Sequence, residues 1–136
     1  MKNLIKKIKE HEGYRPSVYQ CTEGYDTIGY GFAIKDLELS EEICDIILAE
    51  KLAKLQFDIS NKFEWFDDSP ELVKNVVTNM CYQLGLSGFS KFKQTIYYLE
   101  TEQYEEASIE CLDSLWAKQT PNRAKELSEQ LASLAD

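Results

Sequence analysis

Histidine and closely spaced cysteines are scarce in this sequence. Its 136 residues include one histidine and four cysteines, and no two cysteines form a Cys-x-x-Cys pair. Structural zinc sites use such closely spaced ligands, so the sequence predicts no metal site, and nothing in it predicts a cofactor. The spacing favours free thiols in a reducing compartment over a disulfide framework.

Long hydrophobic runs are also absent. No apolar stretch approaches the roughly 20 residues that a membrane-spanning helix needs. Near the N-terminus, Lys6, Lys7 and Lys9 interrupt the apolar residues, whereas a signal peptide needs a continuous apolar segment. We therefore expect no signal peptide and no membrane insertion.

Positive charge is in short supply. Lysine and arginine number 15 against 24 aspartates and glutamates, which gives a formal net charge of -9. Nucleic acid is bound through a basic face, so this balance argues against a nucleic-acid partner. The lysines near the N-terminus leave one basic patch on an otherwise acidic chain.

Hydrophobic residues are plentiful, at 43% of the sequence, which is enough for a single compact domain. Apolar residues recur at helical spacing over residues 1–12, and Gly13 is a natural helix end. Residues 13–39 are rich in β-formers and glycine and predict a small sheet. Its expected strands are 17–19, 25–28 and 32–34, with a turn at Glu23 and Gly24.

Helices are predicted for the rest of the chain. Ser40 is a good N-cap for a long helix over residues 40–60. Ser69 before Pro70 and Thr120 before Pro121 predict two further N-caps. Gly85 and Gly88 are expected to end the helix that starts at Pro70. The remaining periodicity predicts helices near 89–99 and over 104–116, and a last helix from Pro121.

The predicted class is therefore α+β and mostly helical. The predicted organisation is a β lobe (13–39), a connecting helix (40–60) and a helical lobe (61–136 plus 1–12). Cys44, Cys81 and Cys111 fall within apolar helical patterns, so we expect them to be small core residues.

Three sequence blocks resemble a known family. Glu12-Gly13 followed by the TEGYDTIGYG run of residues 22–31 looks like the active-site region of the phage-type lysozymes, the endolysin muramidases. The NMCYQLG run of residues 79–85 is similar to a core helix of that family. The WAKQTPNRAK run of residues 116–125 is similar to its T-even phage member. The resemblance implies a lysozyme-like fold, with a small sheet joined by a long helix to a helical lobe.

Glu12 is the residue expected to act as general acid. It ends a predicted helix, where the partial negative charge of the helix terminus favours the protonated form of a carboxyl group. Glycoside hydrolysis needs such a protonated acid at the leaving oxygen. The resemblance implies hydrolysis of the β-1,4 bond between N-acetylmuramic acid and N-acetylglucosamine in peptidoglycan, with inversion. It also implies that the Thr27 hydroxyl holds the attacking water.

The resemblance further implies a set of substrate-binding residues. The arginine of the last block, Arg123, is expected to pair with Glu12. An aromatic ring with nearby amides suits a sugar, because it offers an apolar face with donors and acceptors beside it. The residues expected to contact the glycan are Ala33, Tyr82, Gln83, Thr95, Trp116, Gln119, Asn122 and Arg123.

Cys21 departs from the family pattern, which has an aspartate, the second carboxylate, at this position. A free thiol titrates near pKa ~8.5, and the acidic neighbours Glu23 and Asp26 are expected to raise the pKa of Cys21. Phe32 also replaces a histidine of the T-even enzyme. Cys21 is therefore predicted to serve in place of the aspartate if its thiolate is formed, and otherwise to be a spectator.

Two other functions remain open on the sequence. One is a lysozyme-like module that binds glycan with little cleavage, because the second carboxylate is missing. The other is a cysteine hydrolase that pairs Cys21 with His11, which is disfavoured because no oxyanion motif is visible. Under the lysozyme interpretation we expect a monomer that is made in the host cytoplasm. It would act on peptidoglycan strands once the membrane is permeabilised.

Overall fold

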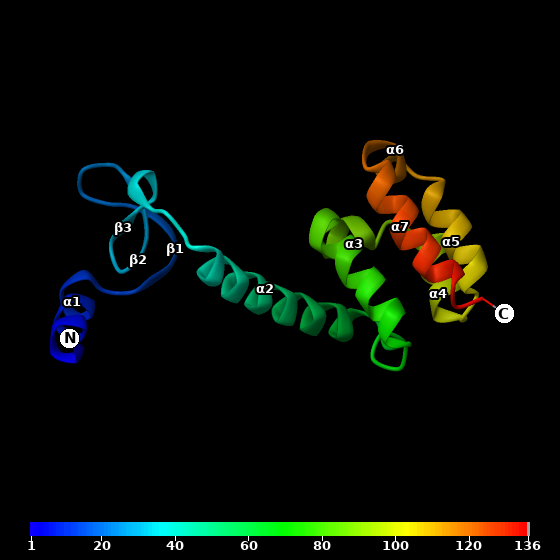
Figure 1. Ribbon diagram of the computed structural model, residues 1–136, viewed down its shortest axis with the longest axis horizontal. Coiled ribbons are helices and arrows are strands. Elements are labelled where there is room, and N and C mark those ends of the chain that lie inside the picture. The colour runs from blue at the N-terminus through cyan, green and yellow to red at the C-terminus, as the bar shows by residue number, and fades with distance from the viewer. Residues whose placement is uncertain (136) are drawn as a thin grey trace. The chain divides into compact units, whose positions relative to one another are not determined.

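The computed structural model describes residues 1–135, which contain seven α-helices, one short 3-10 helix and a three-stranded antiparallel sheet (Figure 1). The predicted α+β, mostly helical, lysozyme-like class is confirmed. The chain divides into two compact units, Met1–Asp45 and Ile46–Asp136. Within residues 1–135, no helix has the length and apolar character needed to cross a bilayer. The assignment of residues 1–12 to the helical lobe stays a prediction.

The first unit begins with helix α1 (Lys2–Glu12), close to the predicted range. Gly13 ends it with φ +72°, a backbone conformation that side chains with a Cβ rarely adopt. The Gly13 N–H donates to the Lys9 carbonyl at 2.9 Å, so the last turn is closed before the chain leaves the helix. Glu12 is thereby fixed at the very end of α1.

The sheet follows in the order β1 (Arg15–Gln20), β2 (Asp26–Gly29) and β3 (Phe32–Ala33). Its strands pair antiparallel, with Tyr19 opposite Thr27 and Ile28 opposite Phe32. The β1–β2 turn lies where it was predicted, and Gly24 (φ +84°) donates its N–H to the Cys21 carbonyl at 2.9 Å. Ile34 was predicted to lie in the third strand but begins the 3-10 helix η1 (Ile34–Asp36).

Helix α2 (Glu41–Lys62) begins in the first unit and continues into the second. Its N-cap was predicted correctly, because the Ser40 hydroxyl oxygen accepts from the Ile43 N–H at 3.2 Å. The prediction that Cys44 is a core residue was wrong, since it is exposed on α2. Helical spacing shows that a residue lies on a stripe of the helix, but not whether that stripe is covered.

The second unit contains α3 (Glu71–Phe89), α4 (Lys93–Glu100), α5 (Tyr104–Leu112), α6 (Leu115–Gln119) and α7 (Pro121–Ala132). Gly85 interrupts α3 with φ +76°, as predicted, whereas Gly88 stays within its last turn. The single helix predicted over 104–116 is wrong. The Ser114 hydroxyl oxygen accepts from the Ala117 N–H at 3.1 Å and starts a separate helix, α6.

Both Ser/Thr-Pro pairs precede a helix, but their hydroxyls do not act as predicted. The Ser69 hydroxyl donates to the Trp65 carbonyl at 2.7 Å, and the Thr120 hydroxyl donates to the Trp116 carbonyl at 2.9 Å. Each hydroxyl therefore satisfies the carbonyl four residues earlier instead of capping the helix that follows. Thr120 occupies the predicted N-cap position of α7 without a side-chain cap, whereas the N-cap of α3 is Pro70 and not Ser69 as predicted.

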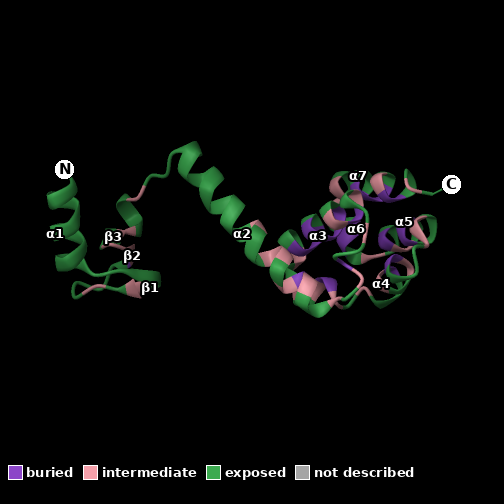
Figure 2. Ribbon diagram, turned by 90° about the horizontal axis from the view of Figure 1, so that it is seen from below, coloured by how far each residue is buried: buried purple, intermediate pink, exposed green. Residues whose placement is uncertain are grey.

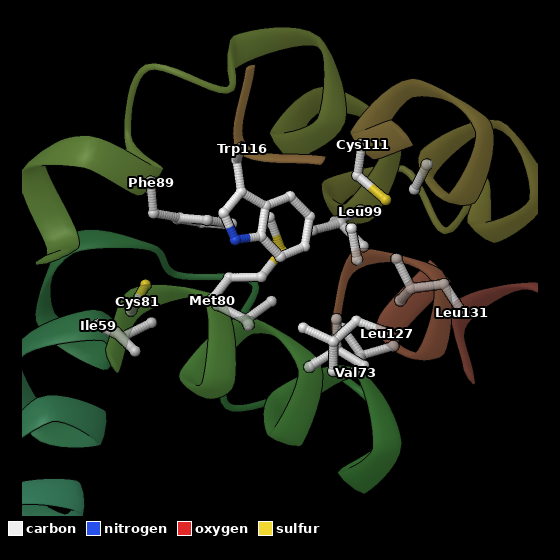
Figure 3. Packing of buried hydrophobic residues seen from close by; sticks show 14 of the residues in the cluster. Ile59, Val73, Met80, Cys81, Phe89, Leu99, Cys111, Trp116, Leu127 and Leu131 are labelled. Carbon is white, nitrogen blue, oxygen red and sulfur yellow. The ribbon is translucent and has the colours of Figure 1, made fainter. Parts of the chain in front are cut away.

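The hydrophobic core lies in the second unit, where the buried residues gather in α3 to α7 and the adjoining end of α2 (Figure 2). Phe89 is fully buried and packs against the rings of Phe63 and Phe92, with centroids 6.0 and 6.3 Å away. Trp116 and Met80 enter the same cluster from α6 and α3 (Figure 3). Cys81 and Cys111 are buried there as predicted, with exposed fractions of 1% and 0%.

Candidate active site

Glu12 is held by the local structure at the end of α1 and is exposed to solvent. Its carboxyl group lies against the turn that joins β2 to β3. A Cβ atom built on Gly31 would lie 2.5 Å from Glu12 Oε2 and 3.1 Å from its Cδ. The hairpin therefore reaches the carboxyl group of the predicted general acid, and no side chain stands between them at this point.

Cys21 lies at the start of the turn after β1 and is half-buried. The backbones of Tyr25 and Glu23 lower the pKa of the thiol below its ordinary value, and the Thr27 side chain adds a smaller effect in the same direction. Partial desolvation and the Glu23 carboxylate oppose this shift without reversing it. The expectation of a raised pKa was wrong, because backbone dipoles that stabilise the thiolate outweigh the charges of nearby carboxylates.

Thr27 is buried, with 3% of its surface exposed, whereas the other predicted catalytic residues are partly or fully exposed. Its hydroxyl donates to the Tyr25 carbonyl at 2.9 Å, and its side chain is close enough to the Cys21 thiol to lower its pKa. Cys21 and Thr27 therefore form one polar group in the first unit. Ala33, on β3, is opposite Thr27 in the sheet register and is half-buried.

Glu12, Cys21 and Thr27 belong to one compact unit. The groups that shift the pKa of the Cys21 thiol lie in the turn and in β2, and His11 is not one of them. A cysteine hydrolase needs a base that accepts the proton of the thiol, and the pairing of Cys21 with His11 stays a prediction.

Two long-range hydrogen bonds organise the predicted substrate-binding residues of the second unit. The Trp116 indole N–H donates to Gln83 Oε1 at 2.9 Å and links α6 to α3. Arg123 donates from Nε to Asn79 Oδ1 at 2.8 Å and from its terminal nitrogen to the Asn79 carbonyl at 3.2 Å. Both side chains are therefore fixed in direction before any ligand binds. The pairing of Arg123 with Glu12 stays a prediction.

Arg123, Asn79 and Tyr82 line one pocket of about 320 Å³. Tyr82 also borders a pocket of about 500 Å³ that is lined by Lys51 and Lys54. Both pockets belong to the second unit, and the ring of Tyr82 is 47% exposed, so it is free to contact a ligand.

The other predicted binding residues are less closely grouped. Gln119 and Asn122 are exposed at the end of α6 and the start of α7. Thr95 is 2% exposed and borders a different pocket of about 420 Å³, together with Phe92 and Ser114. The pocket at Arg123 and the pocket at Thr95 have no lining residue in common.

Two residues of the site were not identified from the sequence. Asn79 fixes Arg123, and Gly31 provides the space beside Glu12. Both lie inside the blocks that carried the family resemblance, but the type of an amino acid does not show which distant side chain it meets. Among residues 1–135, no group of three or more histidine, cysteine, aspartate or glutamate side chains is placed to hold a metal ion.

Comparison with known sequences bears on this site directly. The sequence profile described as phage lysozyme matches residues 9–132, which include every predicted catalytic and binding residue. The chain belongs to the phage lysozyme family. This membership confirms the resemblance and supports a glycoside hydrolase of the lysozyme type.

Relatives of this lysozyme family occur in a phage and in a eukaryote. The chain is 29% identical to "Probable T4-type lysozyme 1" of Dictyostelium discoideum, with 86% of each chain covered. It is 30% identical to "Probable T4-type lysozyme 2" of the same organism, over 90% of this chain and 89% of that protein. It is 25% identical to the "Pre-baseplate central spike protein Gp5" of Enterobacteria phage T4, over 93% of this chain and 27% of that protein.

Proposed function

We propose that this protein is a lysozyme that hydrolyses the β-1,4 bond between N-acetylmuramic acid and N-acetylglucosamine in peptidoglycan, with inversion. The observation that carries the proposal is the position of Glu12, an exposed carboxyl group at the end of α1 that lies against the β2–β3 turn. Glu12 donates its proton to the leaving glycosidic oxygen, as the general acid of an inverting glycosidase does.

The Cys21–Thr27 group acts on the water in this proposal. Thr27 orients the water, the water attacks the anomeric carbon, and the Cys21 thiolate accepts the proton that the water loses. The lowered pKa of Cys21 supports this role, because it increases the thiolate fraction near neutral pH relative to an ordinary thiol. The cycle ends with Glu12 deprotonated and Cys21 protonated, so Glu12 takes up a proton from solvent and Cys21 releases one to solvent before the next turnover.

The second unit supplies all but one of the sugar-binding residues of the proposal, and the exception is Ala33 on β3 of the first unit. Tyr82 offers an exposed ring, and Gln83, Gln119 and Asn122 offer amides. Trp116 is 4% exposed, and its indole N–H holds the Gln83 side chain beside the proposed site. Arg123 adds a fixed positive charge, because Asn79 holds its guanidinium in place. Thr95 and Ala33 complete the proposed set through smaller contacts. The proposed partner is one peptidoglycan strand, bound by a monomer that is made in the host cytoplasm and reaches the wall after membrane permeabilisation.

The test is lysis of outer-membrane-permeabilised cells by the parent and by Glu12→Gln. We expect Glu12→Gln to lose at least about 10²-fold in rate, because general acid catalysis is typically worth that much or more. Its thermal stability should be equal or slightly higher, since Glu12 is exposed and sits at the negative end of a helix dipole. Retention of more than about a tenth of the parent rate would contradict the general-acid role.

Mass spectrometry of the released fragments tests the bond that is cleaved. Borohydride reduction should label N-acetylmuramic acid at the new reducing ends, and proton NMR of the first product should show the inverted anomer. The second candidate is a glycan-binding module with little catalysis, which is favoured by one observation, the thiol at Cys21 in place of a carboxylate. Strand binding by the parent without any release of reducing ends would establish that module and overturn the enzyme.

A further inference from the structure

Gly31 has a special place among the glycines of this chain. Its φ is +77°, and a Cβ atom there would lie 2.5 Å from Glu12 Oε2, 3.1 Å from Cδ and 3.6 Å from Cγ. Gly85 has a similar φ of +76°, but a Cβ atom there would meet no heavy atom within 4 Å. Both glycines therefore have a positive φ, and only at Gly31 does the missing side chain also leave room for a carboxyl group.

The consequence of filling this space follows from which atoms would collide. The carboxyl group of Glu12 is the far end of a flexible, exposed side chain, so it can swing away from a new methyl group at small cost in folding free energy. The same movement takes the acid away from its position beside the hairpin turn. A displacement of about 1 Å in a catalytic group can reduce a rate by about 10²-fold.

We propose that Gly31 is a positioning residue: by lacking a side chain, it lets the β2–β3 turn define where the carboxyl group of Glu12 lies. This inference rests on the proposed function of Glu12 as general acid. Gly31 itself need not touch the substrate for this role. The β2–β3 turn limits on one side where the carboxyl group can lie, and the end of α1 fixes the backbone of Glu12.

The experiment compares Gly31→Ala with Gly85→Ala, using soluble uncrosslinked peptidoglycan fragments as substrate. Both variants place a Cβ at positive φ, so we expect them to lower Tm by similar amounts. Gly31→Ala should lower kcat by about tenfold to a hundredfold with little change in KM, because the acid acts in the transition state. Gly85→Ala should keep kcat within about threefold of the parent, since a Cβ there meets nothing. Equal losses of kcat in the two variants would overturn the proposal.

A second readout tests the contact without any activity. In the parent, NMR should show nuclear Overhauser effects between the α-protons of Gly31 and the γ-protons of Glu12. In Gly31→Ala the side-chain shifts of Glu12 should change, whereas in Gly85→Ala they should not. If the contact is seen but Glu12→Gln remains fully active, the proposed function fails while the geometry stands. If the contact is missing and Glu12→Gln is inactive, the positioning role fails and the proposed function stands.

A double variant shows whether Gly31 acts through Glu12. Adding Gly31→Ala to Glu12→Gln should leave the residual rate within about twofold. The single variant already lacks the carboxylic acid that Gly31 positions, so a further displacement of that side chain costs little. A further tenfold loss in the double variant would mean that the methyl group blocks the substrate directly, which would contradict the positioning role.

Discussion

The two units of this chain differ most in what their interiors contain. Among the described residues, sixteen hydrophobic side chains are buried, and all of them belong to the second unit. The only buried residue of the first unit is Thr27, which is polar. The second unit is stabilised by packing, whereas the first is organised by a helix end, two tight turns and a hairpin ladder. The predicted catalytic residues all lie in the first unit, where buried apolar area is smallest.

This contrast agrees with a general feature of enzymes, in which functional groups are drawn from the less stable parts of a structure. Glu12 and Cys21 are positioned by backbone geometry, through the end of α1 and through N–H groups that point at a sulfur. Substitutions should therefore have different effects in the two units. Substitutions in the second unit should mainly lower stability, and substitutions in the first unit should mainly lower the reaction rate.

The largest expected effect is on stability and compares two phenylalanines. Phe89→Ala removes a side chain with 0% exposure and should lower the free energy of unfolding by about 3–5 kcal/mol. Phe32→Ala, in the first unit, removes a ring that is 47% exposed and should cost about 1 kcal/mol or less. Urea unfolding followed by circular dichroism measures both. Equal costs would show that the first unit has a core comparable to that of the second.

The next effect concerns chemistry at Cys21. Cys21→Ala should lower the lytic rate by about 10²-fold if the thiolate accepts a proton from water. Cys21→Asp should be more active than the parent, because a carboxylate is charged throughout the neutral range. Because the pKa of the thiol is lowered, the parent rate should rise with pH below the range of an ordinary thiol. If Cys21→Ala lyses cells as fast as the parent, the thiol is a spectator. A Cys21→Asp variant clearly slower than the parent would refute the replacement of a carboxylate by the thiol.

A smaller effect is expected in the labelling of the four thiols. Cys21 should react with iodoacetamide several-fold faster near neutral pH than an unperturbed thiol, because its pKa is lowered by the backbone N–H groups of Tyr25 and Glu23. Burial raises the pKa of Cys81 to about 12 and that of Cys111 to about 11, so both should stay unlabelled while the protein is folded. Peptide mapping by mass spectrometry gives the order of reaction. Labelling of Cys81 or Cys111 before Cys21 would contradict the contrast between the units.

The smallest expected effect is that of salt on lysis. The net charge of -9 should oppose approach to an anionic wall, and this repulsion is screened over roughly 8 Å at physiological ionic strength. The lytic rate should therefore rise by a few-fold as salt increases from very low to moderate concentration. Turbidity assays over a salt series measure it. A rate that only falls over this range would show that the N-terminal lysines dominate docking.

The sequence alone determined the features that depend on neighbours along the chain. The end of α1 at Gly13, the cap at Ser40 and the turn at Gly24 were all predicted, because each is decided by backbone sterics or a hydrogen bond within a few residues. The family blocks added the predicted roles of Glu12 and Arg123. These roles depend on residue types at fixed spacing, which the sequence displays directly.

Only the tertiary structure decided what each side chain meets. It placed Cys44 at the surface and Cys81 in the core, although both follow the same helical pattern. It turned backbone N–H groups toward Cys21 and so reversed the predicted direction of its pKa shift. It also set Gly31 beside the carboxyl group of Glu12. The physical reason is shared: burial, the field at a titratable group and free space depend on atoms that folding brings together, and no local pattern encodes them.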